Sequence, residues 1–257
     1  MTRSPGNLLV IRQPEAGYRF SIDPVLLAGF AAPHCRGRVL DLGTGCGVLL
    51  LLLSRLAPAM RSGAGVEIQQ DLWAFAERNF RENSQAPPLR AVRADFRGEM
   101  PGIVPGTFDF AVSNPPYGRP GSGRRNPHPG KEAARHEVHG SLSELFAAAA
   151  RCMAPAGRFA LILPYGRLQE VPDLARREGM GIEETRRVHP REGDPPSRIL
   201  ILLARGAESP PREAPPLYLH AGGEKYCPEV ERVCRLFRPV AGTTPSLRPG
   251  PGSGMSP

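Results

Sequence analysis

Lysine is scarce in this chain of 257 residues: among its 33 basic side chains, only Lys131 and Lys225 are lysines. The sequence also lacks any hydrophobic run approaching the roughly 20 residues of a membrane span, and we see no secretory signal. Its five cysteines are scattered, without the closely spaced pairs typical of metal sites. We therefore expect a cytoplasmic protein that binds no metal, contacts no membrane and has no disulfide framework.

Positive charge is what the composition has in excess. The formal net charge is +8, and arginine presents planar donors that suit phosphate groups. A GC-rich genome would also favour arginine, together with the 30 prolines and 29 glycines, but it does not explain the positive sign. The charge therefore favours an acidic partner.

Short apolar segments alternate with helical patterns along the chain, which predicts an α/β protein with a parallel sheet. The ranges expected as strands are 38–42, 65–67 (the end of a strand), 89–94, 108–113, 158–163, 199–203 and 217–219. The ranges expected as helices are 47–56, 71–83, 141–152, 171–177 and 228–237, and Asp23 with Pro24 is expected to cap another.

The same pattern of segments divides the chain into four parts. Residues 1–37 precede the first strand and are expected to contribute to the ligand pocket, and residues 38–205 form the main α/β domain. Residues 206–241 are expected to be a linker followed by a strand and a helix packed on that domain. Residues 242–257 are rich in Pro, Gly and Ser, and are expected to be disordered.

A glycine-rich loop follows the first predicted strand and opens a helix. Glycines there allow close approach of a ligand to the backbone, and an acid ends the next strand at the spacing used to bind ribose hydroxyls. The GxGxG spacing, with an acid before it, suits a cation such as S-adenosylmethionine better than a pyrophosphate. The alternative is a turn without a ligand. The residues that this pattern assigns to the cofactor are Asp41, Gly43, Thr44, Gly45, Gly47 and Glu67.

A second signal, Asn114-Pro115-Pro116-Tyr117, directly follows the fourth predicted strand. Two prolines make a stiff loop with two acceptors, the side-chain oxygen of Asn114 and the carbonyl of Pro115. These acceptors match the two N–H donors of a planar exocyclic amine, whose ring Tyr117 can stack on. Hydrogen bonds to both protons help localise the lone pair and align it with a methyl group. We predict that all four residues are catalytic and that Asn114 also contacts the cofactor, the alternative being a plain turn.

Three further residue types carry weaker signals. Asp95 follows the third strand, where it could accept a bond from the adenine amine of the cofactor or simply cap its own turn. Cys46 is interpreted as a small packing residue. The histidines at 34, 189 and 220 have no spacing typical of metal ligands.

Taken together, these motifs resemble the class I S-adenosylmethionine-dependent methyltransferases with an Asn-Pro-Pro-Tyr motif, which methylate planar exocyclic amines and amides. Residues 41–47 are similar to the first motif of that family, Glu67 to its ribose-binding acid and residues 114–117 to its catalytic motif. The resemblance implies a Rossmann-like fold, with a mostly parallel, seven-stranded twisted sheet and helices on both faces.

Over most of its length the chain resembles one family, the bacterial tRNA (adenine-N6)-methyltransferases that act on adenine 37 of valine tRNA. The stretches that carry this closer likeness are 20–27, 131–137, 196–202 and 226–229. The resemblance implies that Phe20 and Asp23 contribute to the cofactor pocket and that RNA, most simply a tRNA, is the partner.

Residues 118–140 form a long segment rich in Gly, Pro and Arg immediately after the catalytic motif. It is interpreted as a clamp that orders on the RNA backbone, the alternative being a solvated insert without a role. The residues expected to contact RNA are Arg119, Arg124, Arg125, Lys131, Arg135 and His136.

Other functions remain as alternatives. A release-factor glutamine methyltransferase shares the catalytic motif but carries a helical domain before the first strand, where only 37 residues stand here. A DNA adenine methyltransferase needs a large recognition insert, and a NAD-dependent oxidoreductase needs GxGxxG. A non-catalytic RNA-binding protein would not need these motifs intact. The sequence leaves monomer and dimer both open.

Overall fold

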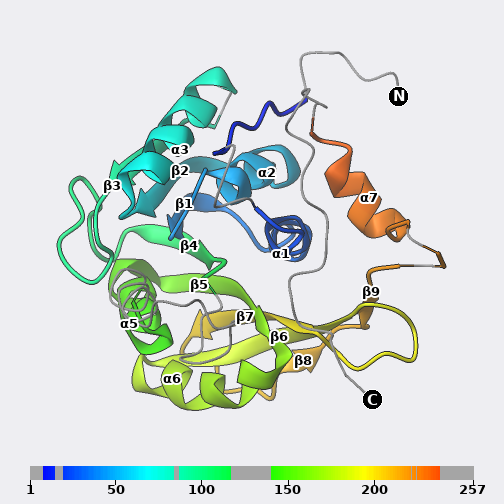
Figure 1. Cartoon of the computed structure of the whole chain (residues 1–257). Coiled ribbons are helices and arrows are strands. Elements are labelled where there is room, and N and C mark those ends of the chain that lie inside the picture. The colour runs from blue at the N-terminus through cyan, green and yellow to red at the C-terminus, as the bar shows by residue number, and fades with distance from the viewer. Residues whose placement is uncertain are drawn as a thin grey trace, which may run out of the picture.

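The computed structural model describes residues 8–14, 20–83, 87–116, 140–220, 222–223 and 225–237. One twisted sheet runs through the molecule with helices on both faces (Figure 1). The strands are β1 (Gly37–Leu42), β2 (Met60–Glu67), β3 (Leu89–Arg93), β4 (Phe108–Ser113), β5 (Met153–Pro164), β6 (Met180–His189), β7 (Arg198–Arg205), β8 (Arg212–Glu213) and β9 (Leu217–Tyr218). The helices are α1 (Asp23–Ala31), α2 (Val48–Leu56), α3 (Gln70–Glu82), α5 (Leu142–Cys152), α6 (Val171–Arg177) and α7 (Pro228–Cys234), with a 3-10 turn at Tyr165–Glu170.

The seven longer strands lie in the order β3-β2-β1-β4-β5-β7-β6. The first five are parallel, and β7 runs antiparallel between β5 and β6. This confirms the expected mostly parallel sheet. The strand expected at 217–219 is the short β9, and the structure adds β8; both pair with β6. The strand pattern of the sequence missed β6 itself.

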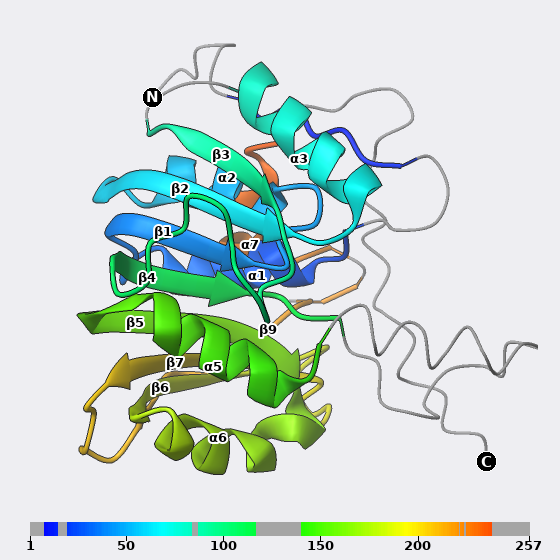
Figure 2. The same ribbon diagram turned by 90° about the vertical axis from the view of Figure 1, so that its left-hand side faces the viewer.

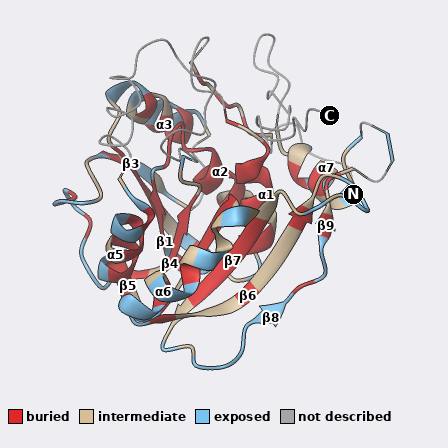
Figure 3. Cartoon of the chain, turned by 60° about the horizontal axis from the view of Figure 1, so that its bottom comes forward, coloured by how far each residue is buried: buried red, intermediate tan, exposed pale blue. Residues whose placement is uncertain are grey.

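Two apolar layers hold the helices against the sheet, because successive strand residues point to opposite faces. Val39 belongs to the layer with α1, α2 and α7, and Leu40 to the layer with α5 and α6. Figure 2 shows these two groups of helices on opposite sides of the strands. Figure 3 shows the central strands buried, whereas β8 lies exposed at the edge.

The two ends of the described chain meet on the α1 side. The Leu9 amide donates to the Leu236 carbonyl at 2.7 Å, and the rings of Phe20 and Phe237 lie 5.6 Å apart. Arg186 on β6 makes a bidentate ion pair with Glu229 on α7, at 2.6 and 2.9 Å. The N-terminal segment and α7 are therefore parts of the same packed unit as the sheet.

Two expectations need correction. The segment 206–216 is not a simple linker, because β8 pairs with β6 and the Ala214 amide donates to the Thr185 carbonyl. Helix α1 begins one residue earlier than expected: Ile22 is the N-cap with helical dihedrals, so Asp23 is the first helical residue. Helix α5 begins at a capping box formed by Ser141 and Glu144.

Candidate active site

The candidate site lies where β1, β2 and β4 end. Their arrowheads point to the same edge of the sheet in Figure 2, and Asp41 pairs with Gly65 on one side and Val112 on the other. The buried hydroxyl of Ser113 donates to the Leu42 carbonyl at 2.7 Å. Since Ser113 precedes Asn114 and Leu42 precedes Gly43, this bond fixes the start of the proline loop beside the start of the glycine loop.

The glycine loop depends on backbone conformations that favour glycine. Gly43, Gly45 and Gly47 have φ angles of 77°, 56° and 80°. A Cβ on Gly43 would meet nothing within 4 Å, whereas a Cβ on Gly47 would lie 2.5 Å from the Phe80 ring. Gly43 therefore lies beside open space that a ligand could fill, and Gly47 lets α2 begin in contact with α3.

Asp41 is a buried acid at the end of β1, with 1% of its surface exposed. Its Oδ2 accepts a bond from the Thr44 hydroxyl at 2.7 Å. Burial raises the pKa of Asp41 to about 7, the Thr44 bond opposes that rise and the nearby Glu67 adds to it. A cationic ligand beside Asp41 would favour its ionised form.

Glu67 at the end of β2 is held by the backbone around it and is 5% exposed. Its Oε2 accepts a bond from the Gly45 amide at 3.0 Å, and its Oε1 accepts one from the Gln69 amide at 2.8 Å. Each carboxylate oxygen has a further lone pair. The carboxylate thus supports the glycine loop and retains acceptor capacity for ribose hydroxyls.

Asn79 on α3 is a loop-supporting residue that the sequence analysis missed. It is fully buried, and its Nδ2 donates to the Cys46 carbonyl and to the Arg12 carbonyl, both at 2.8 Å. The detectable signal was a polar side chain on the apolar face of an amphipathic helix, next to Ala76 and Phe80. Cys46 itself is buried, and burial raises the pKa of its thiol to about 12, in agreement with a packing role.

The proline loop is described as far as Pro116. Asn114 and Pro115 are half-buried and Pro116 is exposed, directly after the buried Ser113. Tyr117 lies outside the described residues, so its predicted stacking role stays a prediction.

The other residues predicted to bind the cofactor, Phe20, Asp23 and Asp95, make contacts with residues outside the glycine loop. Phe20 is buried against Phe237. Asp23 is buried with its Oδ2 3.5 Å from the Arg198 Nε, so it faces a guanidinium. Asp95 accepts bonds from the backbone and side chain of Arg97, which lower its pKa. For Asp95 the observed contacts are those of the turn-capping alternative.

The residues expected to contact RNA, which are Arg119, Arg124, Arg125, Lys131, Arg135 and His136, lie outside the described residues. So does the tail 242–257. Their roles stay predictions from the sequence.

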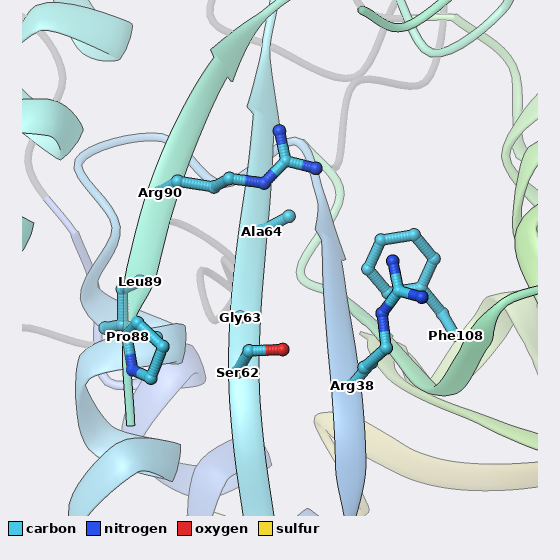
Figure 4. Close-up of a pocket in the computed structure, with 8 residues that line it drawn as sticks. All are labelled: Arg38, Ser62, Gly63, Ala64, Pro88, Leu89, Arg90 and Phe108. Atoms are coloured by element: carbon cyan, nitrogen blue, oxygen red, sulfur yellow. The ribbon is translucent and has the colours of Figure 1, made fainter. Parts of the chain in front are cut away.

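A separate cavity of about 150 Å³ opens at the other edge of the sheet, and Figure 4 shows its lining. It lies at the amino ends of β1, β2, β3 and β4, where the guanidinium carbon of Arg38 lies 5.1 Å from the centre of the Phe108 ring. Ligands of open parallel sheets bind at the carboxyl ends, so this cavity is not the candidate site. Within the described residues there is no cluster of metal-ligand side chains and no helix long and apolar enough to cross a membrane.

Comparisons with known proteins agree with this geometry. The family described as the methyltransferase small domain matches residues 22–169. A tRNA1(Val) (adenine(37)-N6)-methyltransferase from Aeromonas salmonicida is 30% identical and covers 89% of this chain and 92% of its own. One of the same name from Tolumonas auensis is 29% identical, covering 88% and 92%.

A solved structure of a predicted O-methyltransferase from Agrobacterium tumefaciens superposes with a TM-score of 0.66 at 21% identity, covering 83% of this chain and 96% of its own. That likeness shows a shared fold. The family match over residues 22–169 and the 30% identity with the Aeromonas salmonicida relative show that the chain belongs to the methyltransferase small-domain family and, within it, to the family of tRNA1(Val) (adenine(37)-N6)-methyltransferases.

Proposed function

We propose that this protein transfers a methyl group from S-adenosylmethionine to the exocyclic N6 amine of an adenine in tRNA, the anticodon-loop adenine 37 being the expected target. The observation that carries the proposal is the bond between Ser113 and Leu42, which sets Asn114 beside the glycine loop. The names of the relatives, at about 30% identity over most of both chains, support adenine 37 of a valine tRNA.

The residues at the carboxyl edge fit this cofactor. Gly43 leaves open space beside the loop, Asp41 is a buried acid that accepts a bond from the neutral Thr44 hydroxyl, and Glu67 retains acceptor capacity for ribose. When bound, S-adenosylmethionine supplies a methyl group already activated by a positively charged sulfur. The carboxyl group of Asp41 would compensate that charge, and the Thr44 hydroxyl would keep the carboxyl group oriented.

Asn114 and Pro115 would orient the target amine. The Asn114 side-chain oxygen and the Pro115 carbonyl accept one hydrogen bond each from the two N–H groups of the amine. These bonds direct the nitrogen lone pair toward the donor methyl group. As positive charge develops on that nitrogen, both acceptors stabilise it more strongly than in the ground state. Asn114 carries no ionisable group, so its role is to position and polarise the amine. As the nitrogen–methyl bond forms, the sulfur–methyl bond breaks, and the proton that the methylated nitrogen must lose passes to solvent.

Partition of label between macromolecules tests this proposal. The protein would be incubated with methyl-labelled S-adenosylmethionine and an equimolar mixture of unmodified tRNA and a bacterial release factor. We expect label in the tRNA fraction only. Label in the release factor would instead support the glutamine methyltransferase, and stable tRNA binding without any label would support a non-catalytic RNA-binding protein.

A further inference from the structure

Buried and half-buried residues alternate along the segment 8–14 as they do on an edge strand, but one of the buried side chains is polar. Leu9 and Ile11 are buried in the apolar layer of α1 and α2, while Val10 and Arg12 are half-buried. Gln13 occupies the next inward position and is only 7% exposed. An amide in a place that the pattern reserves for an apolar side chain calls for a specific partner.

The side-chain amide of Gln13 has a hydrogen-bond partner for its oxygen but none for its nitrogen within the described residues. Its Oε1 accepts a bond from the Phe20 amide at 3.2 Å, which sets the orientation of the group. Its buried Nε2 has no hydrogen-bond partner in the described part of the chain. An unpaired buried donor is unfavourable, so the protein holds a donor ready for an acceptor that is not part of its own described structure.

Asn79 on α3 and Asn83, the C-cap of that helix, hold this segment against α3. Asn83 accepts from the Val10 amide at 2.9 Å and donates to the Val10 carbonyl at 2.8 Å. Asn79 does the same for Arg12, at 2.8 Å for both bonds, and its Nδ2 also donates to the Cys46 carbonyl. One nitrogen thus contacts both the loop and the residue before Gln13, so the chain enters Gln13 directly from a residue tied to the glycine loop.

The acidic side chains beside that loop, at the ends of β1 and β2, indicate which part of a ligand Gln13 can bind. Asp41 and Glu67 suit the cationic and hydroxyl groups of the cofactor and would repel its carboxylate. The Arg12 guanidinium is engaged outward with Glu82 at 2.7 Å. We propose that Gln13 binds the carboxylate at the amino-acid end of S-adenosylmethionine through its Nε2 group, an inference that rests on the proposed function and adds a cofactor-contacting residue to it.

Calorimetry with two ligands tests this assignment without relying on turnover. S-adenosylhomocysteine carries the amino-acid end, whereas 5′-methylthioadenosine lacks it. Gln13→Leu should weaken S-adenosylhomocysteine about 10- to 100-fold, the range for a hydrogen bond to a charged group, and change 5′-methylthioadenosine by less than about twofold. Gln13→Glu keeps the acceptor for the Phe20 amide and adds negative charge, so it should weaken S-adenosylhomocysteine further still.

Asn83→Ala is the matched control, because it loosens the same segment and leaves the Gln13 amide unchanged. It should lower the melting temperature and affect both ligands in equal proportion. Proportional losses in the Gln13 variants, or unchanged binding of S-adenosylhomocysteine, would overturn the assignment. If the wild-type protein bound neither ligand, the proposed function itself would fail instead.

Discussion

Replacing Asp41 with asparagine should stabilise the ligand-free protein at alkaline pH while it weakens cofactor binding. Asp41 is 1% exposed, its Oδ2 accepts a bond from the Thr44 hydroxyl, and the carboxylate of Glu67 adds negative charge nearby. Asparagine has nearly the same shape, and its Oδ1 can still accept the Thr44 bond. The substitution therefore removes a buried charge with little change in packing.

The magnitude follows from the pKa of this one carboxyl group. Burial raises that pKa from 3.8 to about 7 in the folded protein. Between these values the folded state keeps a proton that the unfolded state has lost, so stability falls as pH rises through the window and levels off above about 7. From pH 5 to pH 8 the loss is at most about 3 kcal/mol, or roughly 6–12 °C in melting temperature for a chain of this size.

Thermal denaturation of the two ligand-free proteins at pH 5 and pH 8 measures this effect. The melting temperature of Asp41→Asn relative to wild type should rise between the two pH values, and Asp173→Asn on the exposed part of α6 serves as control. In parallel, S-adenosylmethionine affinity should increase with pH in the wild type only, because the bound cation favours ionised Asp41. A constant difference in melting temperature would refute the reasoning that Asp41 keeps a buried proton.

The remaining predictions concern the two loops and the basic segment. Gly43→Ala should lower the free energy of unfolding by roughly 1 kcal/mol, the cost of a positive φ. Gly47→Ala should lower it by more, because a Cβ there would also clash with Phe80 on α3. Denaturant titration compares the two variants, and equal losses would contradict the packing role of Gly47. Asn114→Ala should reduce turnover at least ~100-fold, about 2.7 kcal/mol of transition-state stabilisation, with cofactor affinity near wild type by calorimetry; near-normal turnover would remove the proposed role. Joint replacement of Arg124 and Arg125 by glutamate should weaken tRNA binding and flatten its salt dependence, and binding unchanged across a salt titration would dismiss the clamp.

The sequence predicted the sheet well where apolar residues alternate regularly, and failed at β6. Only Met180, Glu184 and Val188 are buried on this strand, so a buried residue occurs at every fourth position instead of at every second one, as in a regular half-buried strand. The register shifts between Ile182 and Glu184, which breaks the alternation. Glu184 is a buried acid stabilised by Arg212 at 2.5 Å, a pairing that no local pattern indicates.

The sequence predicted those residues of the candidate site that lie together in one loop or at a strand end. It did not predict residues that reach the site from distant segments. The acid and glycines of residues 41–47, Glu67 and Asn114 come together as the strand order requires. The support from Asn79 depends on contact between α3 and a segment 67 residues earlier, which spacing along the chain cannot show. For the same reason, the sequence could not show that the missing Cβ of Gly47 also makes room for Phe80.

Nucleoside analysis of a valine tRNA transcript tests the central claim most directly. The transcript would be incubated with S-adenosylmethionine and either wild-type protein or Asn114→Ala, digested, and examined by mass spectrometry, with an otherwise identical transcript carrying guanine at position 37 as control. The account predicts N6-methyladenosine from the wild type, at least ~100-fold less from the variant and none from the control transcript. Methylation at another atom, or equal product from both proteins, would contradict it.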